Sequence, residues 1–196
     1  DPPKQGFPEN FWDYGEVYDE YPIDTARLKN VLNLAADKAG WGGSLPAGEG
    51  IGLAVHRSFV TYVATAARVK IVDGKITVPE MHMAVDCGFA ANPERIRSQM
   101  EGAAVQGMTL ALHSGITYEN GAVSQSNYHD YQMVRSDNYP RKVHTHIVPH
   151  GFEVHASGVG EPGGPPVAPA IANAIFAATG KRLRGLPFGD KFGGAG

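Results

Sequence analysis

A single acidic residue, Glu161, lies inside residues 157–170, a segment otherwise rich in glycine and proline. Pro165 and Pro166 follow it and predict the start of a helix, because proline is favoured at the first helical positions. The positive end of a helix dipole favours an ionised carboxylate, and glycines allow a ligand to approach the backbone closely. A carboxylate placed in this way suits a general base or a ligand contact. A solvated glutamate in a turn before a helix is equally compatible with the spacing.

Gln99 is a second polar candidate, in the first half of a helix predicted from Glu94 to about Leu112. Asn92 and Pro93 mark the start of this helix. A glutamine amide offers two donors and an acceptor, so Gln99 could hydrogen-bond a heterocycle, although an exposed helix glutamine is the simpler interpretation. One face of the helix consists of apolar or small residues, which predicts a closely packed neighbour: Ile96, Met100, Ala103, Ala104, Gly107, Met108 and Ala111.

Two histidines, His144 and His146, lie two residues apart on one face of a strand predicted at residues 143–148. They could form a pair of metal ligands, with His150 and His155 nearby. No carboxylate or cysteine completes the set at a recognised spacing, which favours surface or hydrogen-bonded histidines. We therefore assign no metal ligand to the chain from its sequence.

Two further patterns point to weaker candidates. Ser157 lacks the G-x-S-x-G context of a hydrolase nucleophile. Residues 48–52, GEGIG, lack the strand–turn–helix setting of a dinucleotide site, and we expect a close packing approach there instead of phosphate binding.

The remaining pattern mixes hairpins with helices and predicts an α+β fold. The expected elements are a helix from Asp24 or Thr25 to Gly40, a long or broken strand region at 51–72, a hairpin turn at Asp73–Gly74, a returning strand at 75–85, a turn at 119–121 between two short strands, an irregular stretch at 127–137, a last helix from Pro165 to about Thr179, and a glycine-rich tail from Gly185.

Composition limits the function classes. A net charge of -3 gives no electrostatic case for nucleic acid. Cys87 is the only cysteine, so the chain has no internal disulfide and no cysteine-based metal site. No run of 18 apolar residues predicts a membrane span. Residues 1–21 are dense in aromatic side chains, and we expect them to wrap over another surface.

Three blocks together resemble the C-terminal part of the molybdenum-binding large subunit of the xanthine dehydrogenase/aldehyde oxidase superfamily. They are AVDCG at 84–88 followed by NP at 92–93, QMEGAAVQG at 99–107, and GVGEPG at 158–163. Three more blocks resemble the isoquinoline 1-oxidoreductase β-subunit type, which includes periplasmic aldehyde dehydrogenases: AGWG at 39–42, SNYHDY at 126–131 and PPVAPAIANAIFAATG at 165–180.

This resemblance implies an enzyme that hydroxylates an aldehyde or an electron-poor N-heterocycle with oxygen from water. Its cofactor would be a molybdopterin, in bacteria usually the molybdopterin cytosine dinucleotide. By the family's motif, Glu161 would be the general base, Gln99 would hydrogen-bond the pterin, and Gly158, Val159 and Gly160 would line the cofactor. The pterin would hold the metal, so no protein metal ligand is expected.

The resemblance also implies partners. The chain corresponds to about a quarter of a typical large subunit, so it would share its cofactor with the remainder of that subunit as a separate chain. A [2Fe–2S] subunit would carry electrons away, with a cytochrome c as an optional further partner. A periplasmic location is favoured over a cytoplasmic one. The implied organisation is a wrapping segment at 1–22, the C-terminal portion of the molybdopterin-binding domain at 23–188, and a flexible tail at 189–196.

A second, non-catalytic function stays open. The chain could complete a partner's fold through its aromatic N-terminal segment and an exposed face of small residues on the helix at 94–112. That function leaves the rigid placement of Glu161 unexplained.

Overall fold

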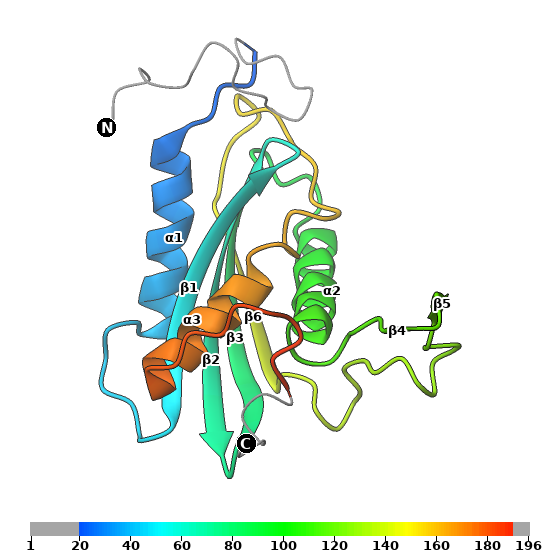
Figure 1. Cartoon of the computed structure of the whole chain (residues 1–196). Helices are drawn as coiled ribbons and strands as arrows, with labels where there is room; N and C mark the ends of the chain where they lie inside the picture. Colours follow the sequence, from blue (N-terminus) through cyan, green and yellow to red (C-terminus); the bar gives the residue numbers. More distant parts are fainter. Residues whose placement is uncertain (1–19, 190–196) are drawn as a thin grey trace.

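The computed structural model describes residues 20–189, so nearly all of the predicted wrapping segment at 1–22 and of the tail at 189–196 lies outside the described residues. Its centre is a four-stranded sheet (Figure 1) in the order β1-β2-β3-β6. The strands are β1 (Glu49–Ser58), β2 (Thr61–Val72), β3 (Lys75–Asp86) and β6 (Lys142–Ile147). The first three are antiparallel neighbours, whereas β6 runs parallel to β3.

Two tight turns connect the antiparallel strands. Asp73 and Gly74 have φ values of 49° and 75°, as expected for the predicted hairpin turn. The strand region predicted at 51–72 is broken by a second turn, at Phe59 and Val60, whose φ values are 51° and 61°. Pro79 lies in β3 where the register with β2 shifts between Arg68 and Lys70, which is the kind of irregularity that accommodates proline in a strand.

Three helices begin and end close to their predicted residues. Helix α1 (Thr25–Ala39) begins after Asp24, whose side chain accepts hydrogen bonds from the amides of Ala26 and Arg27, and ends at Gly40 with φ 66°. Helix α2 (Pro93–Leu112) is capped by Asn92. Helix α3 (Val167–Thr179) follows Pro166 and ends at Gly180.

The helices cover both faces of the sheet, with α1 on one side and α2 and α3 on the other (Figure 1). Alternation along β3 divides its side chains between the two layers. Met81, Met83 and Val85 point into the core beneath α2 and α3, whereas Ala84 packs beneath α1. This three-layer arrangement confirms the predicted α+β class.

Small residues allow α3 to lie directly on β1 and α2. A Cβ atom added to Gly50 or Gly52 of β1 would collide with the α3 backbone, which confirms the close packing approach expected for residues 48–52. A Cβ atom on Gly107 of α2 would lie 2.5 Å from Cβ of Val167. The small face of α2 is therefore mostly buried against α3, and the expectation of an exposed small-residue face is wrong.

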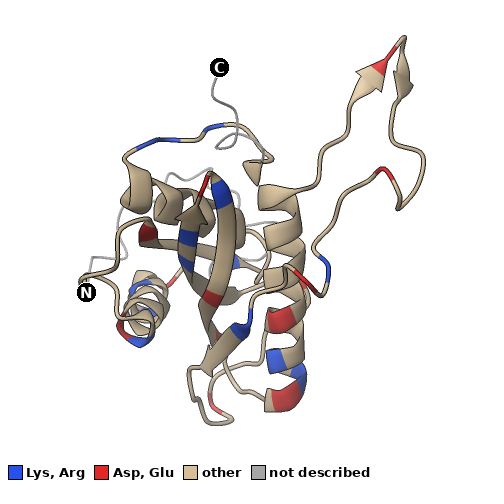
Figure 2. Cartoon of the chain, turned by 90° about the horizontal axis from the view of Figure 1, so that it is seen from below, with Lys and Arg blue, Asp and Glu red and all other residues tan. Residues whose placement is uncertain are grey.

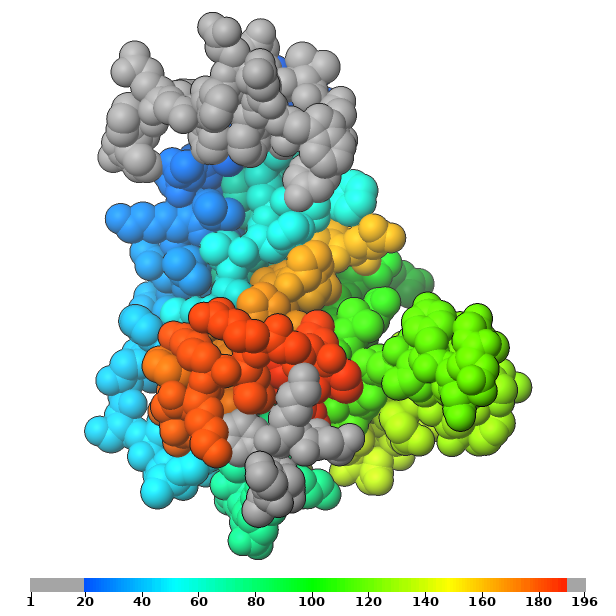
Figure 3. All heavy atoms as spheres, in the orientation of Figure 1, coloured from blue at the N-terminus to red at the C-terminus, as the bar shows by residue number. Residues whose placement is uncertain are grey.

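An arm leaves the body between α2 and β6. It carries the two-residue strands β4 (Tyr118–Glu119) and β5 (Ala122–Val123), and it stands out from the rest of the molecule (Figure 3). Four apolar side chains of the arm are exposed: Ile116, Tyr118, Val123 and Tyr128.

The segment after α3 is packed, so the prediction of a tail beginning at Gly185 is wrong for residues 185–189. Phe188 is buried in the main core and donates its amide to the carbonyl of Ala111 at 2.7 Å. A Cβ atom on Gly189 would collide with the backbone of Leu112, so the chain also passes close to the end of α2.

Candidate active site

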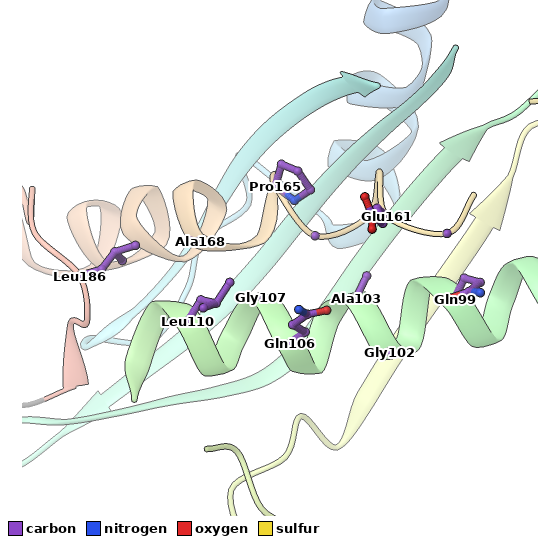
Figure 4. Close-up of a pocket in the computed structure, with 12 residues that line it drawn as sticks. Gln99, Gly102, Ala103, Gln106, Gly107, Leu110, Glu161, Pro165, Ala168 and Leu186 are labelled. Atoms are coloured by element: carbon purple, nitrogen blue, oxygen red, sulfur yellow. The ribbon is translucent and has the colours of Figure 1, made fainter. Parts of the chain in front are cut away.

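A pocket of about 550 Å³ lies between α2, the loop before α3, and Leu186 (Figure 4). Helix α2 forms one wall and the loop carrying Glu161 and Pro165 forms the other. Its lining residues are Gln99, Gly102, Ala103, Gln106, Gly107, Leu110, Gly160, Glu161, Gly164, Pro165, Ala168 and Leu186. Segments about 60 residues apart in sequence, 99–110 and 160–168, thus share one site.

Backbone contacts fix the loop on the N-terminal side of Glu161. The amide of Ser157 donates to the carbonyl of Cys87 at 2.9 Å, and the amide of Gly158 donates to the carbonyl of Phe59 at 3.1 Å. A Cβ atom on Gly158 would lie 2.9 Å from Cβ of Phe59, so glycine allows this approach. The block at 84–88 and the unpredicted turn at Phe59 therefore hold the loop in place.

On the C-terminal side, the loop packs onto α2. A Cβ atom on Gly163 would lie 2.8 Å from Cβ of Ala103 and 3.0 Å from Sδ of Met100. The amide of Gly164 donates to the carbonyl of Glu161 at 3.0 Å and closes a turn. Contacts on both sides thus restrict the backbone at Glu161.

The carboxylate of Glu161 is exposed at the pocket wall and has no hydrogen-bond or ion-pair partner within residues 20–189. It lies five residues before the first residue of α3, Pro166 being the cap, so a turn separates it from the helix. A fixed backbone and an unpaired carboxylate leave this side chain available for a ligand or a proton.

The structure brings some, but not all, of the predicted site residues together. Gln99, Gly160 and Glu161 line the pocket. Gly158 contacts Phe59 outside it, and Val159 packs against the main core. These two residues lie in the support of the loop, beside the pocket.

Gln106 is a pocket residue that the sequence interpretation missed. It lies seven residues after Gln99, so both amides project from the same face of α2. The spacing of 99, 102, 103, 106 and 110 is a helical stripe that could have indicated the site. Together the two glutamines offer four N–H donors and two carbonyl acceptors to a ligand.

A second missed feature supports the block at 84–88. The carboxylate of Asp86 is 1% exposed and accepts hydrogen bonds from Arg27, at 2.5 and 3.0 Å, and from the amide of Gly88 at 3.3 Å. Nε2 of His150 lies 2.8 Å from the same carboxylate. Burial alone would raise the pKa of Asp86, but the hydrogen bonds and charge of Arg27 outweigh it and lower the pKa.

Ser157 has a structural contact and no neighbouring base in the pocket. Its hydroxyl lies 2.7 Å from the hydroxyl of Thr61, so the two groups share a hydrogen bond that links the loop to β2. The weak nucleophile interpretation gains no support from this placement.

The pocket fits a flat, polar cofactor such as a pterin. Gly102 and Gly160 both face open space, because a Cβ atom on either would meet nothing within 4 Å. A side chain at these positions would fill part of the cavity, whereas glycine leaves the backbone accessible. The two glutamine amides match the donor and acceptor edges of a heterocycle.

Charge and length features of the described chain agree with a small-molecule site. Lys, Arg, Asp and Glu are dispersed over the elements (Figure 2). Among the helices within residues 20–189, none has the length and apolar character needed to cross a membrane.

Comparisons with known proteins identify the family. Residues 33–140 match the molybdopterin cofactor-binding domain. The isoquinoline 1-oxidoreductase subunit beta of Brevundimonas diminuta is 33% identical over 162 residues, which cover 80% of this chain and 20% of that protein. The membrane-bound aldehyde dehydrogenase (pyrroloquinoline-quinone) of Gluconacetobacter polyoxogenes is 32% identical over 168 residues, covering 82% of this chain and 21% of that protein.

A solved structure gives the same answer. The aldehyde oxidoreductase of Desulfovibrio gigas superposes with a TM-score of 0.59 at 28% identity, over 68% of this chain and 15% of that one. The chain spans about a fifth of the length of the curated relatives it matches. The family expected from the sequence blocks is confirmed: the chain belongs to the molybdopterin cofactor-binding domain family.

Proposed function

We propose that this chain is part of a molybdenum hydroxylase that oxidises an aldehyde or an N-heterocycle with oxygen from water, and that Glu161 is its general base. The observation that carries the proposal is the unpaired carboxylate of Glu161, fixed opposite Gln99 and Gln106 across one pocket. The relatives whose names specify an aldehyde or isoquinoline reaction support this substrate range.

The residues of the chain divide the work by position. Glu161 accepts a proton at its carboxylate, as the oxygen that derives from water becomes nucleophilic. Gln99 and Gln106 bind and orient the pterin, and Gly102 and Gly160 let it approach the backbone. The bound cofactor supplies the two-electron redox chemistry. Leu110 and Leu186 limit the access of water at one end of the pocket.

The same proposal includes the finer properties of the assembly. The cofactor is the molybdopterin cytosine dinucleotide, shared with the remainder of the large subunit as another chain. A [2Fe–2S] subunit accepts the electrons, with a cytochrome c as an optional further acceptor, and the assembly is periplasmic. The short span of this chain relative to its relatives supports the need for partners.

The test is Glu161→Gln in the assembled, molybdenum-loaded enzyme. Loss of a general base costs about 10²–10⁴-fold in rate, so kcat falls by at least 100-fold while the molybdenum and pterin content stay unchanged. Glu101→Gln is the matched control, because Glu101 is an exposed carboxylate on α2 outside the pocket lining. Turnover of Glu161→Gln within tenfold of the parent would exclude the general-base role.

A non-catalytic function is the second candidate, and one observation favours it. The arm exposes the apolar side chains of Ile116, Tyr118, Val123 and Tyr128, which would be buried if the arm completed a partner's fold. Native purification followed by elemental analysis separates the candidates, because a non-catalytic chain is recovered with neither molybdenum nor pterin.

A further inference from the structure

Four polar side chains gather on the face of the sheet that carries α1, opposite the pocket. Strand β3 supplies Glu80 and His82, and β6 supplies His144 and His146. The parallel register places Glu80 beside Lys142, His82 beside His144 and Ala84 beside His146. Since side chains two residues apart share a face, the alternate residues of both strands point to the same side. The carboxylate that the sequence interpretation lacked for the histidine pair is thus supplied by a distant strand.

The distances within this cluster match those between ligands of one metal ion. Nε2 of His144 lies 3.0 Å from Oε1 of Glu80, and Nε2 of His82 lies 3.5 Å from the same oxygen. Two ligands of a tetrahedral Zn²⁺ ion, each about 2.0–2.1 Å from it, lie about 3.3 Å apart. One ligand atom from each of Glu80, His82 and His144 lies within 4.8 Å of the other two, so small side-chain rotations would close the set.

The fourth residue of the cluster orients one of the ligands. Nδ1 of His82 lies 3.0 Å from Nε2 of His146, and the rings are nearly coplanar in orientation, at 10°. A proton on Nδ1 of His82, donated to His146, leaves the lone pair of Nε2 facing Glu80. Metal-bound histidines usually donate their other ring N–H to such a partner, which fixes the ring.

We propose that Glu80, His82 and His144 bind a divalent transition-metal ion of the Zn²⁺ class, with His146 positioning His82. Two imidazoles and one carboxylate are ligands that Zn²⁺ accepts, and a water molecule takes the fourth position on the open side. The ion cross-links β3 to the edge strand β6, whose residues follow β3 by some 60 positions. Lys38, at the end of α1, is the cationic side chain whose charge acts on His82 and His146 and opposes the ion.

The test is titration of the full chain, freed of metal by chelation, with ZnCl₂ in a calorimeter. The expected result is one Zn²⁺ per chain and a rise in melting temperature on binding. His144→Ala and Glu80→Gln each weaken binding by at least tenfold and abolish the thermal shift. Both side chains are partly exposed, at 40% and 29%, so these variants fold even if His82→Ala does not.

His129→Ala is the matched control, since His129 is 75% exposed on the arm and away from the cluster. It binds Zn²⁺ as the parent does. The site is refuted if the chain shows no saturable one-to-one binding, if the cluster variants bind normally, or if His129→Ala loses as much affinity as His144→Ala. The site lies across the sheet from the pocket, so the outcome does not depend on the proposed oxidation.

Discussion

Two carboxylates, Asp86 and Glu161, have opposite surroundings that suit different roles. Asp86 is buried and accepts hydrogen bonds from Arg27 and the amide of Gly88, with His150 also in contact. Glu161 is exposed at the pocket and has no side-chain partner within the described part of the chain. A carboxylate with all its acceptor capacity occupied stabilises a fold, whereas one that is fixed and unpaired is available to a substrate.

Asp86→Asn tests the structural role through the pH dependence of stability. The pKa of Asp86 is lower in the folded chain than its ordinary value, so its stabilisation is present above about pH 4 and is lost as pH falls through the folded pKa. At pH 7 the variant is less stable by up to about 3 kcal/mol, the lower end for a buried pair because Arg27 is 23% exposed.

Denaturant unfolding from pH 7 down to pH 3 measures this difference. The curves of parent and variant converge below pH 4, because the parent then loses its charged pair. Asp130→Asn, which removes an exposed carboxylate on the arm, serves as the control at pH 7. A parent-to-variant difference that stays constant from pH 7 to pH 3 would show that the charge of Asp86 contributes nothing.

At the scale of elements, the packing of α2 against α3 depends on one glycine and not on its neighbour. Gly107→Ala places a methyl group 2.5 Å from Cβ of Val167 and destabilises the chain by about 1–3 kcal/mol. Gly102→Ala, in the same helix, meets nothing within 4 Å and stabilises it by about 0.5–1 kcal/mol through helix propensity. Midpoints of urea unfolding for the two variants should move in opposite directions.

The elements predicted from local signals are confirmed. Asp24, Asn92 and Gly180 mark helix ends through capping chemistry, and Asp73–Gly74 forms the expected hairpin. The turn at Phe59–Val60 was missed because neither residue is a usual turn former, although both adopt positive φ. That turn is held in place by the loop at 157–158, a contact that no local pattern encodes.

The site was predictable only where one motif carried it. Glu161, Gln99 and Gly160 were identified and do share a pocket, whereas Gln106 required the helical stripe to be recognised. The cluster of Glu80 and His82 with His144 depends on β6 pairing in parallel with β3. Parallel pairing across a long crossover leaves no short-range signature, so sequence spacing could not bring these residues together.

At the scale of the whole molecule, Phe188 ties the end of the described chain to α2 and so places Leu186 at the pocket. Phe188→Ala removes a side chain that is 4% exposed and destabilises the chain by about 3–5 kcal/mol. Phe152→Ala, at a position that is 86% exposed, is the control and changes stability by less than about 0.5 kcal/mol. Thermal unfolding of both variants measures the contrast, and equal losses would contradict the anchoring role of Phe188.

The attachment of Phe188 to Ala111 also sets an order of events during biosynthesis. A chain emerging from the ribosome completes α2 some 75 residues before Phe188 appears, at about 5–20 residues per second. Until then the α2 wall of the pocket faces an open surface, with neither the Glu161 loop nor Leu186 across from it. Cofactor insertion at this pocket is therefore a late, post-translational step, and a chain truncated before Leu186 would emerge with one end of its pocket missing.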